Sequence, residues 1–435
     1  MPVSIEDLYS IYLKHPNIST DSRKLEKGSL FFALQGDNFD GNEYAAQAVK
    51  DGCSYALVDD EKWVEGDQFL LVNDVARALQ QLATYHRSQL NIPVVCITGS
   101  NGKTTTKELL ASVLDKKYKV VSTPGNLNNH LGVPLSVLRI DQDSDIAVIE
   151  LGANHLGEIE FLCGIANPTH GLITNIGKAH LEGFGDLDGV KKAKSELYQY
   201  LRKSGGQVFV NGDNKTLIDL SSGLRSVQYG TTGDCYCVGT LISSDSHLRL
   251  SFNLNKEELG ESNEINSQLL GDYNFENILA AICIGSFFDV AASDIVDAVE
   301  NYVPDNSRSQ EIKTDNNRVI MDAYNANPMN MKAALDNFTR AFQSNRMVIL
   351  GDMLELGAYA GEEHQAIIAY LRAQSYDRVI LVGEEYSKAC SMLRCEHFAS
   401  VDEARIWLES SPPSEMNILV KGSRGIGLEV LLDKL

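Results

Sequence analysis

VVCITGSNGKTTTKE, at residues 94–108, joins a predicted strand to a predicted helix through a glycine-bounded loop. Residues 94–98 are apolar and β-branched, which predicts a buried strand, and residues 103–110 have helical character. A strand, such a loop and a helix N-terminus form a nest of backbone N–H groups that suits a chain of phosphates. The segment therefore predicts an α/β domain that binds a nucleotide. An ordinary turn between strand and helix is the less favoured alternative.

The residues around this loop have the side chains that nucleotide chemistry needs. Lys103 would reach the β- and γ-phosphates, and the hydroxyl of Thr104 or Thr105 would hold Mg²⁺. We expect Lys103 to point into a solvent-filled loop. The general phosphate-loop pattern has four residues between its glycines, whereas two separate Gly99 from Gly102. The spacing is short, but GKT at a strand–helix junction still favours a nucleotide loop.

Length and composition limit the class of protein. A chain of 435 residues is too long for one ordinary core, so two to four domains are expected. The net charge of −21 and the lack of a basic run argue against nucleic acid or an anionic membrane as partner. The sequence has neither an apolar stretch long enough to span a membrane nor a signal segment, so we expect a cytoplasmic protein. The eight cysteines are scattered, and the spacing of Cys235 and Cys237 favours buried free thiols over a zinc or redox pair.

Residues 1–91 predict a small α/β domain, with a hinge near residues 91–93. The polar segment at residues 20–45, TDSRKLEKGSLFFALQGDNFDGNEYA, would by itself be a set of solvated turns. The predicted helices are residues 5–13 and 73–90, and the predicted strands are residues 30–34 and 55–58.

Residues 92–305 alternate between predicted strands and helices, which indicates a mostly parallel sheet covered on both faces. Further strands are expected at residues 146–151, 171–176 and 207–211, and residues 233–266 predict an antiparallel appendage. Residues 191–200 predict a helix with lysines on several faces. Another helix begins after Gly271, where Asn274 and Asn277 either cap the helix or read a base edge.

Polar side chains follow two of these strands. Glu150 ends one strand, with Asn154 and His155 next in the chain, and Lys178 and His180 follow another strand. Ligands of such sheets bind at the carboxyl ends of the strands. A carboxylate and an imidazole beside a phosphate loop fit an environment for Mg²⁺ and a γ-phosphate. Taken singly, a helix cap and a packed loop histidine are the commoner fates of such residues.

Residues 306–435 predict a third, Rossmann-like domain after a linker at residues 304–308. No GxGxxG follows any of its strands, so a dinucleotide site is not expected. DAYNANP (322–328), GDMLELG (351–357) and KGSRG (421–425) indicate a substrate site, with loops and helix caps as the alternative. The predicted strands are residues 318–321, 347–350, 378–382 and 417–420, and the predicted helices are residues 329–342 and 363–374.

The ordered series GSNGKTTT, ELGANH, TNIGKAH, KAKSELY, GDYNFENILAA, DAYNANP, GDMLELG and KGSRG closely resembles the Mur ligase family, the ATP-dependent amide ligases of cell-wall precursor synthesis. The short glycine spacing of the loop is a feature of these ligases. The polar N-terminal segment resembles a UDP-binding segment of the family, so the resemblance covers essentially the whole chain. DAYNANP, GDMLELG and GANH are similar to motifs of the members that add D-alanyl-D-alanine to UDP-N-acetylmuramoyl-tripeptide, the last cytoplasmic step of precursor synthesis.

The resemblance implies a role for each motif. The first domain would hold UDP, the central domain MgATP, and the third domain the dipeptide, in a chain expected to be a monomer. Relatives commonly have serine and methionine where this chain has Gly425 and Leu428, so the tail departs from the family pattern. The implied residues are Asp21, Ser22 and Arg23 for UDP; Gly99, Ser100, Asn101, Gly102, Lys103, Thr104, Thr105, Asn277, Arg308 and Asp322 for ATP; Thr104, Glu150 and His180 for Mg²⁺; Asn129, Asn154, His155, Asn325 and Asn327 for the substrates; and Lys103, Glu150, His180 and Lys194 for catalysis.

The implied chemistry begins with transfer of the γ-phosphoryl group to a carboxylate, because a free carboxylate is a poor acyl donor. The dipeptide's neutral amine then attacks the acyl phosphate. Lys103, Mg²⁺ and His180 would offset the repulsion between the two anions. In the family, a lysine corresponding to Lys194 carries an N-carbamate, whereas without the resemblance a solvated helix lysine is favoured.

Two other functions remain open at this level. Folylpolyglutamate synthase shares the loop and much of the domain plan, but neither the UDP segment nor DAYNANP is expected in it. A nucleotide-binding scaffold without ligase activity belongs to a different class. The presence of Lys103, Glu150, His180 and Lys194 argues against a scaffold.

Overall fold

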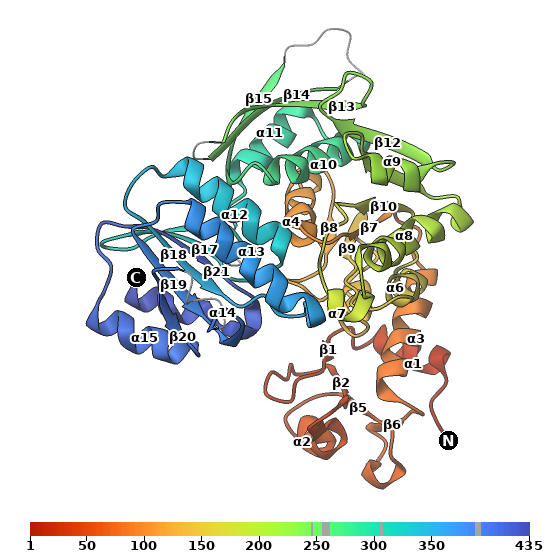
Figure 1. The fold of residues 1–435 in the computed structure, drawn as a ribbon. Coiled ribbons are helices and arrows are strands. Elements are labelled where there is room, and N and C mark those ends of the chain that lie inside the picture. The colour runs from red at the N-terminus through yellow and green to blue at the C-terminus, as the bar shows by residue number, and fades with distance from the viewer. Residues whose placement is uncertain (245–246, 255–261, 305–307, 388–392) are drawn as a thin grey trace.

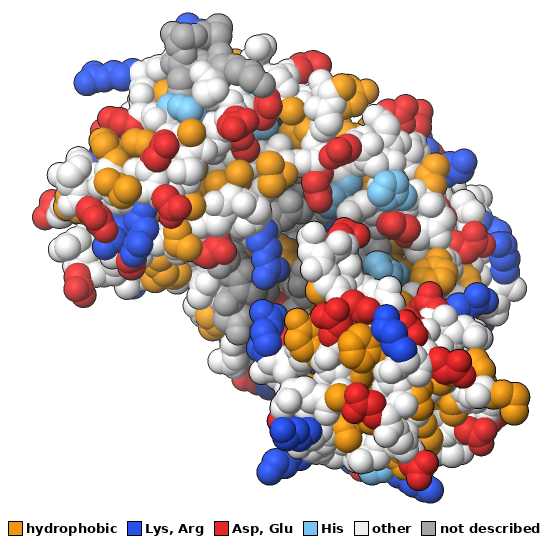
Figure 2. Space-filling model, turned by 90° about the horizontal axis from the view of Figure 1, so that it is seen from below, with side chains coloured by type: hydrophobic (Ala, Val, Ile, Leu, Met, Phe, Trp, Pro, Cys, Tyr) orange, Lys and Arg blue, Asp and Glu red, His pale blue; other side chains and the backbone are white. Residues whose placement is uncertain are grey.

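The protein is built of three α/β units, each around its own sheet (Figure 1). The structure is a computed structural model that describes residues 1–244, 247–254, 262–304, 308–387 and 393–435. Within these ranges, every helix is too short or too polar to cross a membrane. Acidic and basic side chains are interspersed over the face seen in Figure 2. The fold class predicted from the sequence is confirmed.

The N-terminal unit has a parallel sheet in the order β1-β2-β5-β6. Ser4 and Asp74 cap the two longer helices, each accepting a hydrogen bond from a backbone N–H of the first turn. The elements are α1 (Ile5–Tyr12), β1 (Ile18–Ser19), β2 (Leu30–Phe32), the β3–β4 pair (Gln35–Gly36 and Phe39–Asp40), α2 (Ala45–Lys50), β5 (Tyr55–Val58), β6 (Phe69–Leu71) and α3 (Val75–Ser88).

Helix α3 attaches this unit to the central one. It packs against α1 on one side and against two helices of the central unit, α5 (Gly132–Val137) and α6 (Glu158–Ala166), on the other. His86 Nε2 lies 2.6 Å from the carbonyl oxygen of Ile140, and Arg87 Nε donates to the carbonyl of Ala166 over 3.0 Å. Burial lowers the pKa of His86, which favours the neutral ring. The hinge expected near residues 91–93 is therefore bridged by contacts of α3.

The central unit has a sheet in the order β15-β14-β13-β12-β11-β10-β7-β9-β8. The pairs from β12 to β8 are parallel, and β13, β14 and β15 pair antiparallel, as predicted for the appendage. Residues 245–246 and 255–261 of that appendage lie outside the described residues. The strands are β7 (Val94–Thr98), β8 (Val120–Ser122), β9 (Ile146–Glu150), β10 (His170–Ile173), β11 (Gln207–Asn211), β12 (Arg225–Gly230), β13 (Cys237–Ser243), β14 (His247–Leu254) and β15 (Asn263–Leu270).

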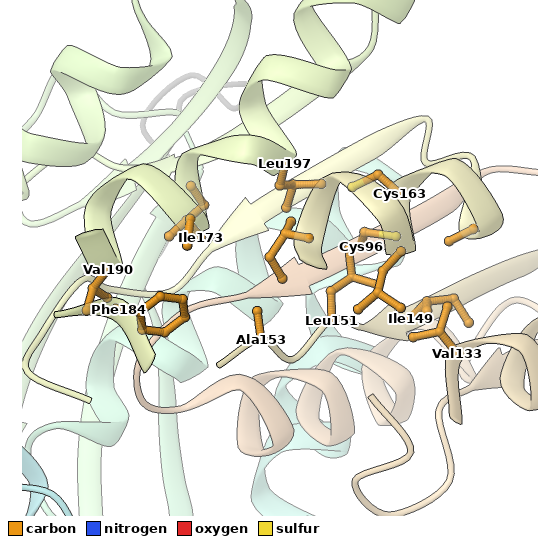
Figure 3. Packing of buried hydrophobic residues seen from close by; sticks show 14 of the residues in the cluster. Cys96, Val133, Ile149, Leu151, Ala153, Cys163, Ile173, Phe184, Val190 and Leu197 are labelled. Atoms are coloured by element: carbon orange, nitrogen blue, oxygen red, sulfur yellow. The ribbon is translucent and has the colours of Figure 1, made fainter. Parts of the chain in front are cut away.

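Helices cover both faces of this sheet, so strand β7 is buried along its whole length. Its alternate residues enter different cores: Val95 and Ile97 pack with α4 (Lys103–Leu114), α10 (Asn274–Phe287) and α11 (Ala292–Asn301), while Cys96 packs on the opposite face. Figure 3 shows Cys163 of α6 and Leu197 of α8 (Leu187–Ser204) over that opposite face, near Cys96 and Ile149. Two-sided burial explains the continuous apolar run of β7. The remaining helices are α7 (Leu181–Phe184) and α9 (Lys215–Ser221).

The C-terminal unit has a sheet in the order β16-β17-β21-β18-β19-β20, parallel except for the β16–β17 pair. Asn327 and Asn330 form a capping box at the start of α12, with Pro328 in its first turn. Residues 305–307 of the predicted linker lie outside the described residues. The elements are β16 (Gln310–Lys313), β17 (Arg318–Asp322), α12 (Pro328–Ala341), β18 (Arg346–Gly351), α13 (Ala360–Ala373), β19 (Arg378–Val382), α14 (Glu384–Ser387), β20 (Glu396–Phe398), α15 (Val401–Ser410) and β21 (Asn417–Lys421).

Five buried cysteines agree with the prediction of free thiols: Cys53, Cys96, Cys163, Cys237 and Cys283. Cys235 is also buried. Cys390 lies outside the described ranges.

Candidate active site

A cavity of about 1050 Å³ lies between the central and C-terminal units. It lies beside the phosphate loop after β7 and beside the carboxyl ends of β9 and β17, as expected for a sheet of this type. Most of the predicted site residues line it: Ser100, Asn101, Gly102, Lys103, Thr104, Thr105, Asn129, Glu150, Asn154, His155, His180, Asn277, Arg308, Asp322 and Asn325. The predicted residues that do not line it are Asp21, Ser22, Arg23, Gly99, Lys194 and Asn327.

Both glycines of the phosphate loop are required by the packing. Gly99 has φ +148° and Gly102 has φ +78°, which L side chains rarely adopt. A Cβ on Gly99 would lie 2.0 Å from Thr174 Oγ1, and one on Gly102 would lie 2.4 Å from Asn277 Oδ1. Gly102 precedes α4 without a side-chain cap, so the first N–H groups of this helix remain available to an anion.

The predicted solvent-directed position of Lys103 is wrong. Its Nζ folds back on the loop and donates to the carbonyl oxygens of Gly99, over 2.6 Å, and Ser100, over 3.3 Å. Desolvation lowers the pKa of Lys103, while the charge of Glu150 raises it and that of Arg308 lowers it. The ammonium takes these carbonyls because a partly desolvated cation needs hydrogen-bond acceptors. It therefore lies within the loop that would hold the phosphates.

Glu150 is bound at both carboxylate oxygens. It accepts hydrogen bonds from Thr104 Oγ1 and from Asn128 Nδ2, each over 2.8 Å, and its side chain is 1% exposed. Glu150 ends β9 and does not cap a helix, so the helix-cap alternative considered from the sequence does not apply to it. Paired carboxylate and hydroxyl oxygens are ligands that Mg²⁺ prefers, so Glu150 and Thr104 fit such an ion. Among the described residues, no three or more His, Cys, Asp or Glu side chains are grouped to hold a metal.

His180 connects the two units. It has a left-handed backbone (φ +51°), and its Nδ1 lies 2.5 Å from Glu355 Oε2 in the GDMLELG loop. The close contact with His180 lowers the pKa of Glu355. A second contact nearby joins Lys178 Nζ to Glu363 Oε1 over 2.7 Å. In this structure His180 thus joins the units, and a contact with Mg²⁺ stays a prediction.

Asn101 makes a further contact between the units. Its Oδ1 accepts hydrogen bonds from Asn327 Nδ2, over 2.7 Å, and from Asn330 Nδ2, over 3.0 Å. The amide of Asn327, predicted to lie near the dipeptide, is used here to hold the phosphate loop against α12. Asn330 did not emerge from the sequence, although it stands three residues after Asn327 in the position of a capping box.

A buried ion pair lies on the C-terminal side of the cavity. Lys421 Nζ lies 2.7 Å from Asp322 Oδ2 and also donates to the carbonyl of Asn325, and Lys421 is 1% exposed. The guanidinium carbon of Arg308 lies 3.7 Å from the ring centroid of Tyr324. Sequence reasoning did not single out Lys421 or Tyr324. Their positions within KGSRG and DAYNANP were the available signal.

Asn277 packs against Gly102 of the phosphate loop. It is 6% exposed, its Oδ1 accepts from Thr106 Oγ1, and its Nδ2 donates to Asn274 Oδ1 over 2.8 Å. Both ends of the amide are therefore engaged within the protein. The predicted contact with adenine would have to exchange one of these bonds.

Lys194 is buried in α8, one residue layer behind the cavity. It is 1% exposed, and its Nζ donates over 3.3 Å to the carbonyl of Ala153, which lines the cavity. The pKa of Lys194 is lowered to about 7, chiefly by burial and then by the charge of Lys103, against the opposing charges of Glu158 and Glu196. The solvated-helix alternative is therefore wrong for Lys194, whereas Lys192 is exposed.

The remaining predicted residues have structural contacts. Arg23 and Asp21 pair with each other over 2.8 Å on the surface of the N-terminal unit, away from the cavity. Asn129 Oδ1 accepts hydrogen bonds from two backbone N–H groups at the start of α5. The backbone N–H groups of Asn154 and His155 donate to Glu158, and the His155 ring is exposed at the cavity wall.

The three units and the phosphate loop define a class of protein that sequence comparison identifies. The description "Mur ligase family, catalytic domain" matches residues 15–98, "Mur ligase middle domain" matches residues 97–285, and "Mur ligase, glutamate ligase domain" matches residues 307–424. The chain belongs to the Mur ligase family.

Within the family, the relatives with high similarity have one activity in their names. The UDP-N-acetylmuramoyl-tripeptide–D-alanyl-D-alanine ligase of Bacillus subtilis is 34% identical, with 96% of this chain and 92% of that protein covered. The enzyme of the same name from Escherichia coli is also 34% identical, with 95% and 92% covered. A crystal structure of MurF from Acinetobacter baumannii has a TM-score of 0.86 and 31% identity, and covers 100% of this chain and 99% of that one.

Proposed function

We propose that this chain is an ATP- and Mg²⁺-dependent amide ligase that joins D-alanyl-D-alanine to UDP-N-acetylmuramoyl-tripeptide in the cytoplasm, as a monomer. The observation that carries the proposal is that the phosphate loop and the DAYNANP and KGSRG segments line one shared cavity. Residues 1–91 would bind the UDP-sugar, residues 92–305 ATP and residues 306–435 the dipeptide. Relatives with this activity in their names match nearly the whole chain, including the N-terminal unit.

The phosphate loop would bind the triphosphate through the N–H groups of residues 99–105 and the Lys103 ammonium. Because Lys103 now donates to the carbonyls of its own loop, it must turn toward the phosphates when ATP binds. Glu150 and Thr104 would hold Mg²⁺, which neutralises phosphate charge when bound. Arg308 and Asp322 line the same cavity from the C-terminal side and would complete the nucleotide site.

The reaction has two steps. An oxygen of the tripeptide carboxylate attacks the γ-phosphorus, ADP leaves, and an acyl phosphate forms. The neutral amine of the dipeptide then attacks the acyl carbon, the amide bond forms, and phosphate leaves as the amine loses its proton. The contribution of the protein is to position the reactants and offset their negative charges. Lys103 and His180 would supply positive charge at the developing phosphate oxygens.

We propose that Lys194 carries an N-carbamate, formed when its neutral amine attacks CO₂ and loses a proton. A pKa of about 7 leaves a substantial fraction of neutral amine at neutral pH. The product replaces a buried cation by an anionic oxygen ligand beside the carbonyl of Ala153. Such an oxygen would suit Mg²⁺, whereas the ammonium would repel it.

Two observations argue against the alternative functions. A glutamate ligase of the folylpolyglutamate type would not need the UDP-like segment at residues 20–45. A scaffold without activity would not need a buried Glu150–Thr104 pair and a lysine of depressed pKa beside one cavity. The test is product analysis: incubation with ATP, UDP-N-acetylmuramoyl-tripeptide and D-alanyl-D-alanine should give the pentapeptide mass, ADP and phosphate in equal amounts. Formation of a glutamate adduct with a folate substrate under the same conditions would contradict it.

A further inference from the structure

Two arginines share one aromatic ring at the C-terminal side of the cavity. The guanidinium carbon of Arg308 lies 3.7 Å, and that of Arg424 lies 5.3 Å, from the ring centroid of Tyr324. Arg424 begins the short 3-10 helix Arg424–Ile426 after β21, and Tyr324 lies between β17 and α12. All three residues line the cavity. Two cations over one ring therefore line the cavity between the central and C-terminal units.

Arg424 is an exposed positive charge without a counterion in the part of the chain that the structure describes. Across the described residues its guanidinium has neither a hydrogen-bond nor an ion-pair partner. Of the other cations of this part of the site, Lys421 pairs with Asp322 and Lys103 donates to the carbonyls of its own loop, whereas Arg308, assigned above to the nucleotide site, has a buried Nε without a partner among the described residues. An anion that entered the cavity would therefore meet Arg424 with its donors free.

Two buried polar atoms beside Arg424 also lack partners. The Tyr324 hydroxyl and Arg308 Nε are buried and make no hydrogen bond to any described residue. Buried polar groups in native proteins are normally hydrogen-bonded. Both atoms are donors, and together with the Arg424 guanidinium they form a set that suits an anionic oxygen ligand.

The reach of the chain limits which anion fits. Tyr324 and Asn327 are three residues apart, so their Cα atoms are separated by at most about 10 Å. Asn327 contacts Asn101 of the phosphate loop over 2.7 Å. A dipeptide in extended form spans about 7 Å. An extended dipeptide with its carboxylate at Arg424 therefore has a length comparable with the separation between Tyr324 and Asn327, the residue that contacts the phosphate loop.

We propose that Arg424 binds the free carboxylate of the incoming dipeptide, with Tyr324 completing the site, and so selects an acceptor that ends in a carboxylate. The planar guanidinium of arginine matches a carboxylate with two parallel hydrogen bonds. This inference rests on the proposed function. Arg424 is a specificity residue and takes no part in phosphoryl transfer.

The experiment compares D-alanyl-D-alanine with D-alanyl-D-alaninamide, which lacks the negative charge, in wild-type protein and in Arg424→Met. Loss of a charge-assisted contact should lower kcat/KM for the dipeptide about 10- to 100-fold in Arg424→Met, mainly through KM. The wild-type protein should lose a similar factor with the amide. The variant should use the dipeptide and the amide within about twofold of each other. Arg424→Lys should recover part of the selectivity, and Arg372→Met, an exposed arginine outside the cavity, should behave as wild type.

Each other outcome overturns the inference. Equal loss with dipeptide and amide in Arg424→Met would mean that the guanidinium acts on another group. A raised KM for ATP would assign it to phosphate, and a raised KM for the UDP-tripeptide would assign it to a carboxylate of that substrate. Unchanged selectivity between dipeptide and amide in Arg424→Met would show that Arg424 has no role in binding the acceptor. If the wild-type protein uses another acceptor and not D-alanyl-D-alanine, the proposed function itself fails. That result comes from the wild type alone, so it is distinguishable from a failure of the inference about Arg424. A melting temperature within a few degrees of wild type confirms that Arg424→Met is folded.

Discussion

Asn101 in the phosphate loop and Asn327, the N-cap residue of α12, are joined by a hydrogen bond of 2.7 Å, although they are 226 positions apart in the chain. Asn330 adds a second bond to the same oxygen. The loop that would bind ATP is thus attached directly to the domain that would bind the acceptor. The position of the C-terminal domain therefore affects the geometry of the phosphate loop that would bind ATP.

The first prediction tests this connection. Asn327→Ser keeps a good N-cap for α12 but removes the amide donor to Asn101. We expect kcat to fall several-fold, because the phosphate loop and the acceptor site lose a shared contact, while the free energy of unfolding changes by less than about 1 kcal/mol. Steady-state kinetics and denaturant melts measure the two quantities. Asn101→Ala should show the same kinetic defect, and unchanged kcat in both variants would contradict the connection.

Replacing Lys103 by alanine should abolish turnover and leave the fold intact. Among the described parts of the chain, its Nζ donates only to carbonyls of its own loop, so little of the core depends on it. Removing a preorganised charge from a phosphoryl transition state costs about 3 kcal/mol or more, which corresponds to a loss of more than 100-fold. ADP release and thermal melting are the readouts. Near-normal turnover in this variant would exclude the loop as the catalytic phosphate site.

The third prediction concerns the carbamate. Lys194→Ala should be nearly inactive and should regain part of its activity when a short carboxylic acid is added, because the acid supplies the missing oxygens. Lys192→Ala, on the exposed side of the same helix, is the matched control and should keep full activity with or without the acid. Full activity of Lys194→Ala, or an unmodified ammonium in a high-resolution map of the metal-bound protein, would count against the carbamate.

Burial of Lys194 also predicts a pH dependence of stability in CO₂-free buffer. Its folded pKa of about 7 is below the ordinary value of 10.5, so the unfolded chain binds more protons between these values. The loss of stability caused by burying the charged Lys194 is full below about pH 7. It disappears as the pH rises toward 10.5, at a slope of roughly 1.4 kcal/mol per pH unit. The free energy of unfolding of the wild type, relative to Lys194→Met, should therefore rise over this window. A constant difference between the two proteins would show that Lys194 is not desolvated.

The sequence predicted local structure well because local structure depends on local patterns. Strands β5, β7, β11 and β19 have the predicted bounds, and Glu150 at the end of β9 and His180 in the loop after β10 do line one cavity. A strand that is buried on both faces has a continuous apolar run in its sequence. A loop with positive φ angles needs glycine at those positions.

Contacts between the units could not be read from the sequence. The pair His180–Glu355 depends on how two domains dock and on which rotamers meet there, and the pair Asp322–Lys421 depends on the pairing of β17 with β21 within the C-terminal unit. Lys103 was mispredicted for a related reason, since nothing local shows that an ammonium will bind the carbonyls of its own loop. The motifs pointed to the right loops but not to the partners within them.

The most direct test of the ligase assignment is ADP release measured with UDP-N-acetylmuramoyl-tripeptide and D-alanyl-D-alanine added separately and together. The proposed function predicts rapid release only when UDP-N-acetylmuramoyl-tripeptide and D-alanyl-D-alanine are both present, with background rates for either alone and for the tripeptide with glutamate. Equal turnover with a folate substrate and glutamate, or ATP hydrolysis that is independent of both substrates, would contradict it.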